Sequence, residues 1–259
     1  MSFGGEEAFG EKMIEETVEI DTDDGLMTVH GFCPDELREY PAVILYMDAS
    51  GIREELKNMS RQITSQGYFC LLPDLYHRLG TIRFDPERRD GNRDDAMKDV
   101  VTACRLSLNN AGVMRDTKGM LAYLDGHERV RKGAKGCIGY CMSGQNVVSA
   151  IGTFPEHFQA GAALYGVGVV TEKEDSPHLL AGRMKGELYF GFAEVDDLVP
   201  DNVIPDLEAA LKNNGIAYEC KVFPGTRHGF CFEERAVYNR DAATEVWEKA
   251  FALFKRRLG

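Results

Sequence analysis

The sequence predicts an α/β protein with one mostly parallel, doubly wound sheet that is flanked by helices and preceded by an antiparallel hairpin. The chain has 259 residues, of which 44% are hydrophobic, enough apolar side chains to cover both faces of a parallel sheet. From Pro41 onward, short apolar runs alternate with longer helical stretches, as crossover helices between parallel strands require. No linker rich in Pro, Gly or Ser separates these units, so we expect a single domain over residues 1–259.

Two alternating segments begin the predicted sheet. Residues 14–33 alternate apolar and polar side chains on either side of Asp23-Asp24-Gly25. An Asp-Gly pair between alternating strands is typical of a tight hairpin turn. We therefore expect an antiparallel hairpin at one edge of the sheet, and we expect residues 1–13 before it to form a flexible tail.

Six further strands are expected where short apolar runs are bounded by turn-forming or charged residues, at residues 42–47, 69–73, 136–140, 161–164, 186–191 and 217–223. Helical spacing of apolar residues predicts helices over residues 54–66, 94–123 with a break near Asn110, 144–153, 203–214 and 241–257. Residues 76–93 are rich in Asp, Arg and Gly and predict a loop over the carboxyl edge of the sheet. Such loops usually carry substrate contacts in doubly wound folds.

Charge and hydropathy argue against nucleic-acid and membrane partners. The formal net charge is -12 and the sequence pI is near 5.0, which repels phosphate backbones. The longest nearly apolar run, residues 160–170, contains three glycines and is too short to span a bilayer. Acidic residues occupy the amino terminus where a secretory signal would be basic and then apolar. We therefore expect a cytoplasmic protein that binds neither nucleic acid nor membrane.

The cysteine and histidine pattern predicts reduced thiols and no metal site. Seven cysteines, an odd number without paired C-x-x-C spacings, fit free thiols better than a disulfide framework or a zinc knuckle. Most of them are expected to be small core residues. The six histidines include no pair with metal-ligand spacing.

The stretch Gly139-Tyr140-Cys141-Met142-Ser143-Gly144 carries the first chemical signal. A Gly two residues before a nucleophile and a small residue two after it allow a tight strand-turn-helix elbow that raises the side chain above the sheet. Cys141 would be that nucleophile, and the amides that open the following helix would stabilise a thiolate. A buried structural cysteine is the alternative interpretation. Ser143 is the rival nucleophile, but it would place Cys141 and Gln145 where the elbow needs glycine-sized groups.

An acid and a base follow in the chain order that such an elbow needs. Asp196 comes just after an apolar strand, with Glu194 and Asp197 as nearby competitors, and His228 lies in a turn after the last strand. A nucleophilic cysteine is activated by an imidazole that a carboxylate orients. Taken alone, each residue also fits a solvated loop.

These motifs together make the chain resemble the dienelactone hydrolase family of α/β hydrolases between residues 42 and 228. The resemblance lies in Gly-Tyr-Cys-x-Ser-Gly at 139–144, Asp-x-x-Val-Pro at 196–200, His-Gly-Phe at 228–230, and Gln-Gly-Tyr followed by Pro-Asp-Leu-Tyr within 66–76. It implies an α/β-hydrolase fold with a catalytic triad of Cys141, His228 and Asp196, in which Cys141 is the nucleophile, His228 the base and Asp196 its orienting partner.

The same resemblance assigns further positions and marks two departures from the family. The backbone amides of Ala49 and Met142 would form the oxyanion hole. Asp48 occupies the place of a family glutamate that helps activate the thiol, with a purely structural aspartate as the alternative. The family's arginine four residues after the histidine is replaced by Phe232. Candidate substrate contacts are therefore Arg78, Arg93 and Phe230, with Arg88, Arg89 and Arg235 as further arginines nearby.

The predicted function is hydrolysis of a small-molecule ester or lactone through a thioester on Cys141, with no cofactor. Because a thiolate leaves easily, the substrate should carry an enol, aryl or other activated leaving group. The alternative is a non-catalytic binding or redox-sensing protein on the same fold. We expect a monomer or a small homo-oligomer.

Overall fold

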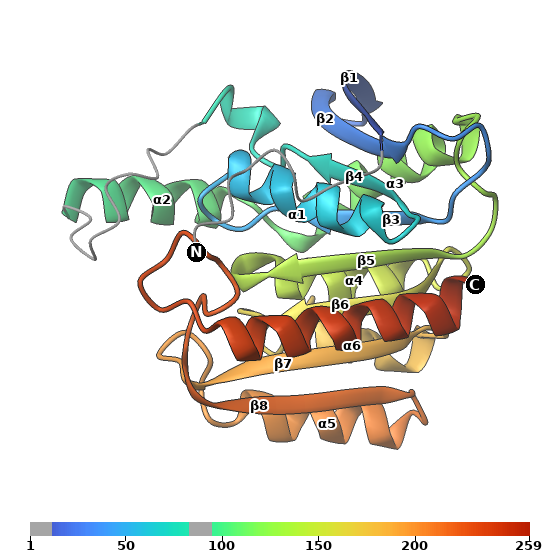
Figure 1. Cartoon of the computed structure of the whole chain (residues 1–259). Helices are drawn as coiled ribbons and strands as arrows, with labels where there is room; N and C mark the ends of the chain where they lie inside the picture. The colour runs from blue at the N-terminus through green and yellow to red at the C-terminus, as the bar shows by residue number, and fades with distance from the viewer. Residues whose placement is uncertain (1–11, 83–94) are drawn as a thin grey trace.

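A computed structural model describes residues 12–82 and 95–259, and eight strands in these ranges form one mixed sheet (Figure 1). Their order is β1-β2-β4-β3-β5-β6-β7-β8. The pairs β1–β2 and β2–β4 are antiparallel and all other pairs are parallel. The strands are β1 Met13–Thr22, β2 Gly25–Pro34, β3 Ala42–Tyr46, β4 Phe69–Pro73, β5 Lys135–Tyr140, β6 Phe158–Leu164, β7 Glu187–Val195 and β8 Tyr218–Arg227.

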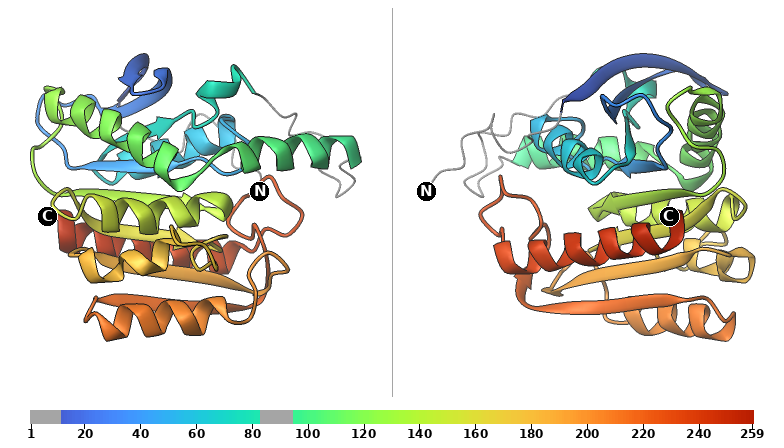
Figure 2. Two further views of the ribbon diagram at one scale, coloured as in Figure 1. Left: turned by 180° about the vertical axis from the view of Figure 1, so that it is seen from behind. Right: turned by 45° about the vertical axis from the view of Figure 1, so that its right-hand side comes forward.

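Helices cover both faces of this sheet, as the sequence predicts (Figures 1 and 2). Helices α1 and α6 lie on one face, while α3, α4 and α5 lie on the other. The helix bounds are α1 Glu54–Ser65, α2 Asp95–Ser107, α3 Asn110–Gly126, α4 Gly144–Thr153, α5 Val203–Asn213 and α6 Arg240–Leu258. Short 3-10 turns are η1 His77–Leu79, η2 Cys141–Ser143 and η3 Pro177–Arg183.

The amino-terminal hairpin is confirmed at the sheet edge. Strands β1 and β2 pair from Met13 opposite Pro34 to Thr22 opposite Gly25. Gly25 has a φ of 113°, a conformation that glycine adopts at little cost in a tight turn. Residues 1–11 of the expected tail lie outside the described residues, and Met13 already belongs to β1 because it pairs across the hairpin.

The expected break near Asn110 is the start of a separate helix. The side chain of Asn109 accepts a hydrogen bond of 2.8 Å from the amide of Gly112, which satisfies one of the free amides that begin α3. Helix α2 ends at Ser107. The single interrupted helix that we expect over residues 94–123 is thus two helices.

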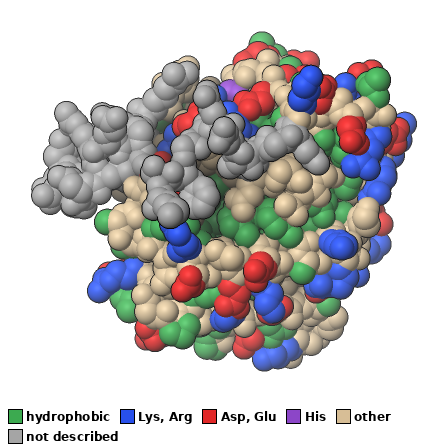
Figure 3. All heavy atoms as spheres, in the orientation of Figure 1, with side chains coloured by type: hydrophobic (Ala, Val, Ile, Leu, Met, Phe, Trp, Pro, Cys, Tyr) green, Lys and Arg blue, Asp and Glu red, His purple; other side chains and the backbone are tan. Residues whose placement is uncertain are grey.

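The core lies around β4, β3 and β5, which are adjacent in the middle of the sheet. All residues of these strands are buried, because helices cover both of their faces. The edge strand β8 instead consists mostly of exposed and partly buried residues. Around α6, acidic and basic side chains are interspersed on the surface (Figure 3), and ion pairs such as Lys249–Glu219 and Arg256–Glu187 tie the helix to the neighbouring strands.

Strands β7 and β8 are longer than the sequence predicts, and this matters for the site. Each extends four residues beyond its expected end, to Val195 and Arg227. Charged, Pro and Gly residues in these extensions weaken the sequence signal for a strand, and the pairing shifts register between Ala193 and Val195. Because Val195 pairs with Arg227, the next residues of the two strands meet at the carboxyl edge of the sheet.

None of the helices within residues 12–82 and 95–259 is long and apolar enough to cross a membrane. All seven cysteines lie in these ranges and are free thiols. Six of them are buried, as expected for core residues, and Cys220 is half-buried.

Candidate active site

Cys141 lies on a sharp turn between β5 and α4, where the elbow is predicted. Its φ is 55°, in the left-handed region that costs a non-glycine residue about 1–2 kcal/mol. A Cβ on Gly139 would lie 2.6 Å from the carbonyl oxygen of Ser143, and one on Gly144 would lie 2.3 Å from the Cα of Gly166. The turn is therefore closed so tightly that only glycine fits at both positions.

The rival nucleophile Ser143 is placed below the elbow rather than on it. Its side chain is completely buried. The hydroxyl donates a hydrogen bond to the carbonyl of Met47 and accepts one of 3.2 Å from Asn146. Ser143 thus fastens the elbow to the end of β3, and its hydroxyl is buried and engaged in two hydrogen bonds.

His228 and Asp196 meet at the carboxyl edge of the sheet. They directly follow the paired residues at the ends of β8 and β7, and Nδ1 of His228 lies 2.7 Å from Oδ2 of Asp196. The amide of Leu198 donates to the other carboxylate oxygen at 3.0 Å. The ring of Tyr165 packs edge-on against the imidazole, with 5.0 Å between ring centroids. The carboxylate and the tyrosine together fix the orientation of the histidine.

The two competing acids are directed elsewhere. Glu194 is exposed and accepts a hydrogen bond of 2.8 Å from the amide of Gly225. Asp197 is also exposed. Of the three carboxylates in this loop, Asp196 is the one whose ion pair with His228 is present.

The ionisation of His228 links the histidine to the cysteine. Burial disfavours the charged ring, but the hydrogen bond to Asp196 and the interaction with the Cys141 sulfur outweigh it and raise the pKa of His228 to about 9. Nε2 of the ring is buried and makes no hydrogen bond of ordinary geometry within the described part of the chain. Protonation at neutral pH would place an imidazolium beside the sulfur of Cys141.

Asp48 is held by two arginines. Its side chain is completely buried and forms ion pairs with Arg53 and, at 2.7 Å, with Arg235. Burial alone would raise the pKa of Asp48, but these guanidinium groups outweigh that effect and lower it. Arg53 also pairs with Glu234 at 2.5 Å. The carboxylate therefore joins the loop after β3 to the segment that follows His228.

Phe232 lies between these two arginines. The guanidinium carbons of Arg53 and Arg235 are 4.9 Å and 4.7 Å from the centroid of its ring, within the range of cation–π attraction. The ring is completely buried. The residue that replaces the family's arginine thus packs against two other arginines, neither of which the sequence analysis placed next to Asp48.

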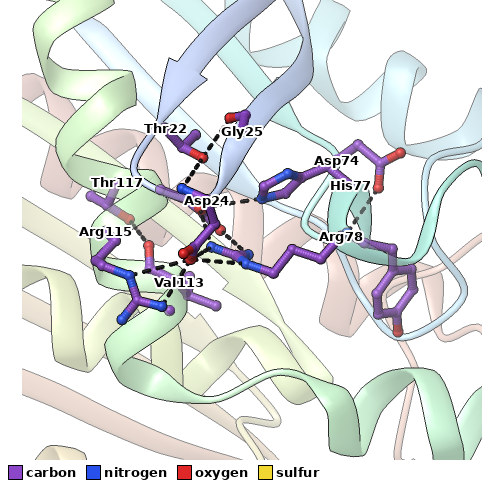
Figure 4. Close-up of polar contacts among 12 residues, drawn as sticks. Thr22, Asp24, Gly25, Asp74, His77, Arg78, Val113, Arg115 and Thr117 are labelled. Carbon is purple, nitrogen blue, oxygen red and sulfur yellow. Dashed lines mark hydrogen bonds and ion pairs between the residues drawn. The ribbon is translucent and has the colours of Figure 1, made fainter.

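Arg78 and Phe230, two of the expected substrate contacts, have other partners in the structure. Arg78 donates to the buried carboxylate of Asp116 at 2.7 and 2.9 Å and to Asp24 at 2.5 Å, and Figure 4 shows Asp24 between Arg78 and Arg115. Its guanidinium therefore fastens η1 to the hairpin turn and α3. Phe230 is completely buried against Tyr165 and Phe223, as a support for the histidine loop. Arg93, like Arg88 and Arg89, lies outside the described residues.

Several residues near the elbow carry no local sequence signal for their role. Tyr165 follows β6 with a φ of 37° and contacts His228, and Arg53 and Arg235 reach Asp48 from different parts of the chain. A local sequence pattern does not predict a non-glycine residue at positive φ after a buried strand, because this backbone conformation depends on the surrounding fold. No group of three or more His, Cys, Asp or Glu side chains in residues 12–82 and 95–259 could hold a metal ion.

Comparison with known proteins identifies relatives along nearly the whole chain. Residues 27–258 match the dienelactone hydrolase family. A Synechocystis protein assigned as a carboxymethylenebutenolidase is 26% identical over 231 residues, covering 87% of this chain and 89% of its own length. An Aquifex aeolicus protein with the same assignment is 25% identical and covers 84% and 89%.

Solved structures share the fold. The crystal structure of a protein from Klebsiella pneumoniae assigned as a dienelactone hydrolase superposes with a TM-score of 0.82 at 21% identity. The match covers 95% of this chain and 99% of that chain. The mixed sheet, its flanking helices and its amino-terminal hairpin are thus those of the α/β-hydrolase fold.

Proposed function

Because this chain belongs to the dienelactone hydrolase family, it is a hydrolase, and we propose that it cleaves esters or lactones through a triad of Cys141, His228 and Asp196. Three features support the triad. Cys141 stands on a strained elbow, His228 is hydrogen-bonded to Asp196, and the Cys141 sulfur contributes to the raised pKa of the imidazole. This combination of nucleophile, base and orienting carboxylate is the one that acyl transfer needs.

Acylation begins from a thiolate beside an imidazolium. The sulfur of Cys141 attacks the carbonyl carbon, and the carbonyl oxygen gains negative charge. The backbone amides of Ala49 and Met142 stabilise that charge, since Ala49 follows β3, the neighbour of β5, and Met142 lies in the turn η2 that leads into α4. The imidazolium of His228 then donates its proton to the departing oxygen, which leaves a thioester on Cys141.

Deacylation uses the same groups in the opposite order. The neutral imidazole of His228 takes a proton from water, and the hydroxide formed attacks the thioester. The tetrahedral intermediate collapses with departure of the Cys141 thiolate, and the acid product leaves. Asp196 keeps Nδ1 of the ring protonated, so that Nε2 is the nitrogen that exchanges protons.

The thiol limits the substrates. When the tetrahedral intermediate collapses, sulfur and the substrate's alkoxide compete as leaving groups, and a thiolate departs more readily than an ordinary alkoxide. With enol and aryl esters the intermediate collapses to the thioester instead of expelling the Cys141 thiolate, because the oxygens of these substrates are good leaving groups. Relatives assigned as carboxymethylenebutenolidases support a cyclic enol ester, and simple alkyl esters should be poor substrates.

The strained geometry of Cys141 is the observation that carries this proposal, and replacing its sulfur tests it. Cys141→Ala should reduce turnover of an activated aryl ester to background, whereas Ser143→Ala should keep turnover well above background, with only the partial loss that follows from removing its hydrogen bond to Met47. Both proteins should remain folded by circular dichroism. Full activity in Cys141→Ala together with loss in Ser143→Ala would instead assign the reaction to the serine.

A further inference from the structure

We propose that Tyr76 is a positioning residue for the oxyanion hole, an inference that rests on the function proposed above. Its phenol group is completely buried. The hydroxyl donates a hydrogen bond of 3.0 Å to the carbonyl of Ala49 and lies 3.7 Å from the sulfur of Met142. One hydroxyl thus contacts both residues whose amides would stabilise the oxyanion.

The loop after β3 is fixed through three consecutive carbonyl groups. The carbonyl of Met47 accepts from the hydroxyl of Ser143, that of Asp48 accepts from the amide of Gly51 at 3.0 Å, and that of Ala49 accepts from Tyr76. Each donor comes from a different place: the elbow, the loop itself and the segment after β4. Together they define the orientation of the peptide groups in this loop.

These contacts determine where the amide of Ala49 points. In a trans peptide the carbonyl and the N–H of one plane point in opposite directions. Because the carbonyl of Asp48 faces Gly51, the amide of Ala49 in the same plane points away from that turn. Tyr76 holds the next plane, so that Ala49 has both of its peptide planes fixed. Loss of the phenol hydroxyl would free the second plane, and rotation about the backbone bonds of Ala49 that join the two planes would then let the amide of Ala49 change its direction.

Tyr76 is itself rigidly held and remains a donor. Its amide donates a hydrogen bond of 2.9 Å to the carboxylate of Asp74, and its carbonyl accepts one of 2.7 Å from Leu79. Burial, with contributions from Cys104, Asp48 and Cys141, raises the pKa of Tyr76 above its ordinary value. The phenol therefore stays protonated, and able to donate its hydrogen bond, at neutral pH.

The direct test is Tyr76→Phe, which removes one oxygen and keeps the ring. Fixed oxyanion donors contribute chiefly to kcat, so we expect kcat for an aryl ester to fall about 10-fold while KM changes less than about twofold. Affinity for an aldehyde analogue of the substrate, which forms a charged hemithioacetal oxygen on Cys141, should fall by about the same factor. The matched control is Tyr189→Phe, because the hydroxyl of Tyr189 is buried and lacks a hydrogen-bond partner in the described structure.

Alkylation by iodoacetamide separates the oxyanion hole from the thiol. This displacement at a saturated carbon uses the Cys141 sulfur but creates no oxyanion. Its rate should therefore be the same in wild type and Tyr76→Phe. An unchanged rate would also show that the variant is folded. Unchanged kcat and aldehyde affinity in Tyr76→Phe would overturn the positioning role. An equal loss in alkylation rate would also overturn it, because Tyr76 would then act on the thiol.

The wild-type protein distinguishes failure of this inference from failure of the proposed function. If activated esters acylate Cys141 in the wild type and Tyr76→Phe behaves like the control, only the role of Tyr76 is lost. If the wild type is neither acylated by these esters nor inhibited by the aldehyde, the thioester mechanism fails and the inference fails with it.

Discussion

Nδ1 of His228 lies 2.7 Å from Oδ2 of Asp196, although the two residues are 32 positions apart in the chain. The contact follows from the pairing of strands β7 and β8. Val195 and Arg227, the last residues of these strands, lie opposite each other, and Asp196 and His228 directly follow them in the chain. The side chain of Asp196 is 4% exposed, so that its charge is poorly screened by water. This relationship explains the raised pKa of the imidazole and leads to the first two predictions.

Asp196→Asn should lower both the pKa of His228 and the turnover. The amide cannot stabilise an imidazolium as a carboxylate does, and it permits the wrong tautomer. We expect kcat for an aryl ester to fall by about 10²–10⁴-fold, the usual contribution of acid–base catalysis. Titration of His228 by NMR should show a pKa below the wild-type value of about 9. Asp197→Asn is the matched control, because that carboxylate is exposed.

Stability should depend on pH through His228. Its pKa is raised from 6.5 to about 9 in the folded protein, so the folded state binds the proton more tightly than the unfolded state does. The resulting stabilisation is fully present below pH 6.5 and is lost as pH rises through about 9, with a limit of about 3 kcal/mol. Urea unfolding of wild type and His228→Gln should be measured at pH 6.5 and at about pH 9. The free energy of unfolding should fall more between these two pH values in the wild type, and equal falls in both proteins would contradict this prediction.

Gly144→Ala should destabilise the elbow. The added Cβ would lie 2.3 Å from the Cα of Gly166, a backbone atom that cannot rotate away. Overpacking of this kind costs about 1–3 kcal/mol. Gly126→Ala at the end of α3 is the matched control, since nothing lies within 4 Å of its added Cβ, and thermal unfolding of the two variants makes the comparison. Equal melting temperatures would show that the elbow is looser than described.

Asp48→Asn should reduce stability strongly. The change leaves Arg53 and Arg235 without their shared carboxylate, and removal of one partner of a buried ion pair typically costs about 3–5 kcal/mol. Arg53 keeps its ion pair with Glu234, but its side chain is only 6% exposed, so that water cannot replace the carboxylate of Asp48. Chemical unfolding of this variant beside the exposed Asp197→Asn measures the difference. A loss below about 1 kcal/mol would show that the arginines have other sources of compensation.

The positions of the strands along the chain, the elbow and the chain positions of Asp196 and His228 could be predicted because they depend on local patterns. Apolar runs mark buried strands, and small residues around Cys141 mark a tight turn. The contacts of Asp48, Arg78 and Tyr76 could not be predicted in this way. Arg235 reaches Asp48 across 187 positions, and Arg78 finds Asp116 across 38 positions. Such pairs have no periodic signal and depend on tertiary packing.

The last two strands, β7 and β8, could be predicted only in part from the sequence, because their final residues depend on tertiary pairing. Residues 192–195 and 224–227 include Glu, Pro and Gly, which are uncommon within strands. They extend the sheet because each strand has its neighbour beside it, and tertiary pairing overrides local preference. The sequence therefore indicates which residues belong to the site, while the paired ends of β7 and β8 determine how they meet.

The most direct test of the central claim is mass spectrometry of the wild-type protein quenched within its first turnovers on an activated aryl ester. We expect one added acyl group, carried as a thioester by the peptide that contains Cys141, and we expect this group to be absent from Cys141→Ala. An acyl group on Ser143 or on any other residue, or turnover with no acylated Cys141 at any quench time, would contradict the central claim.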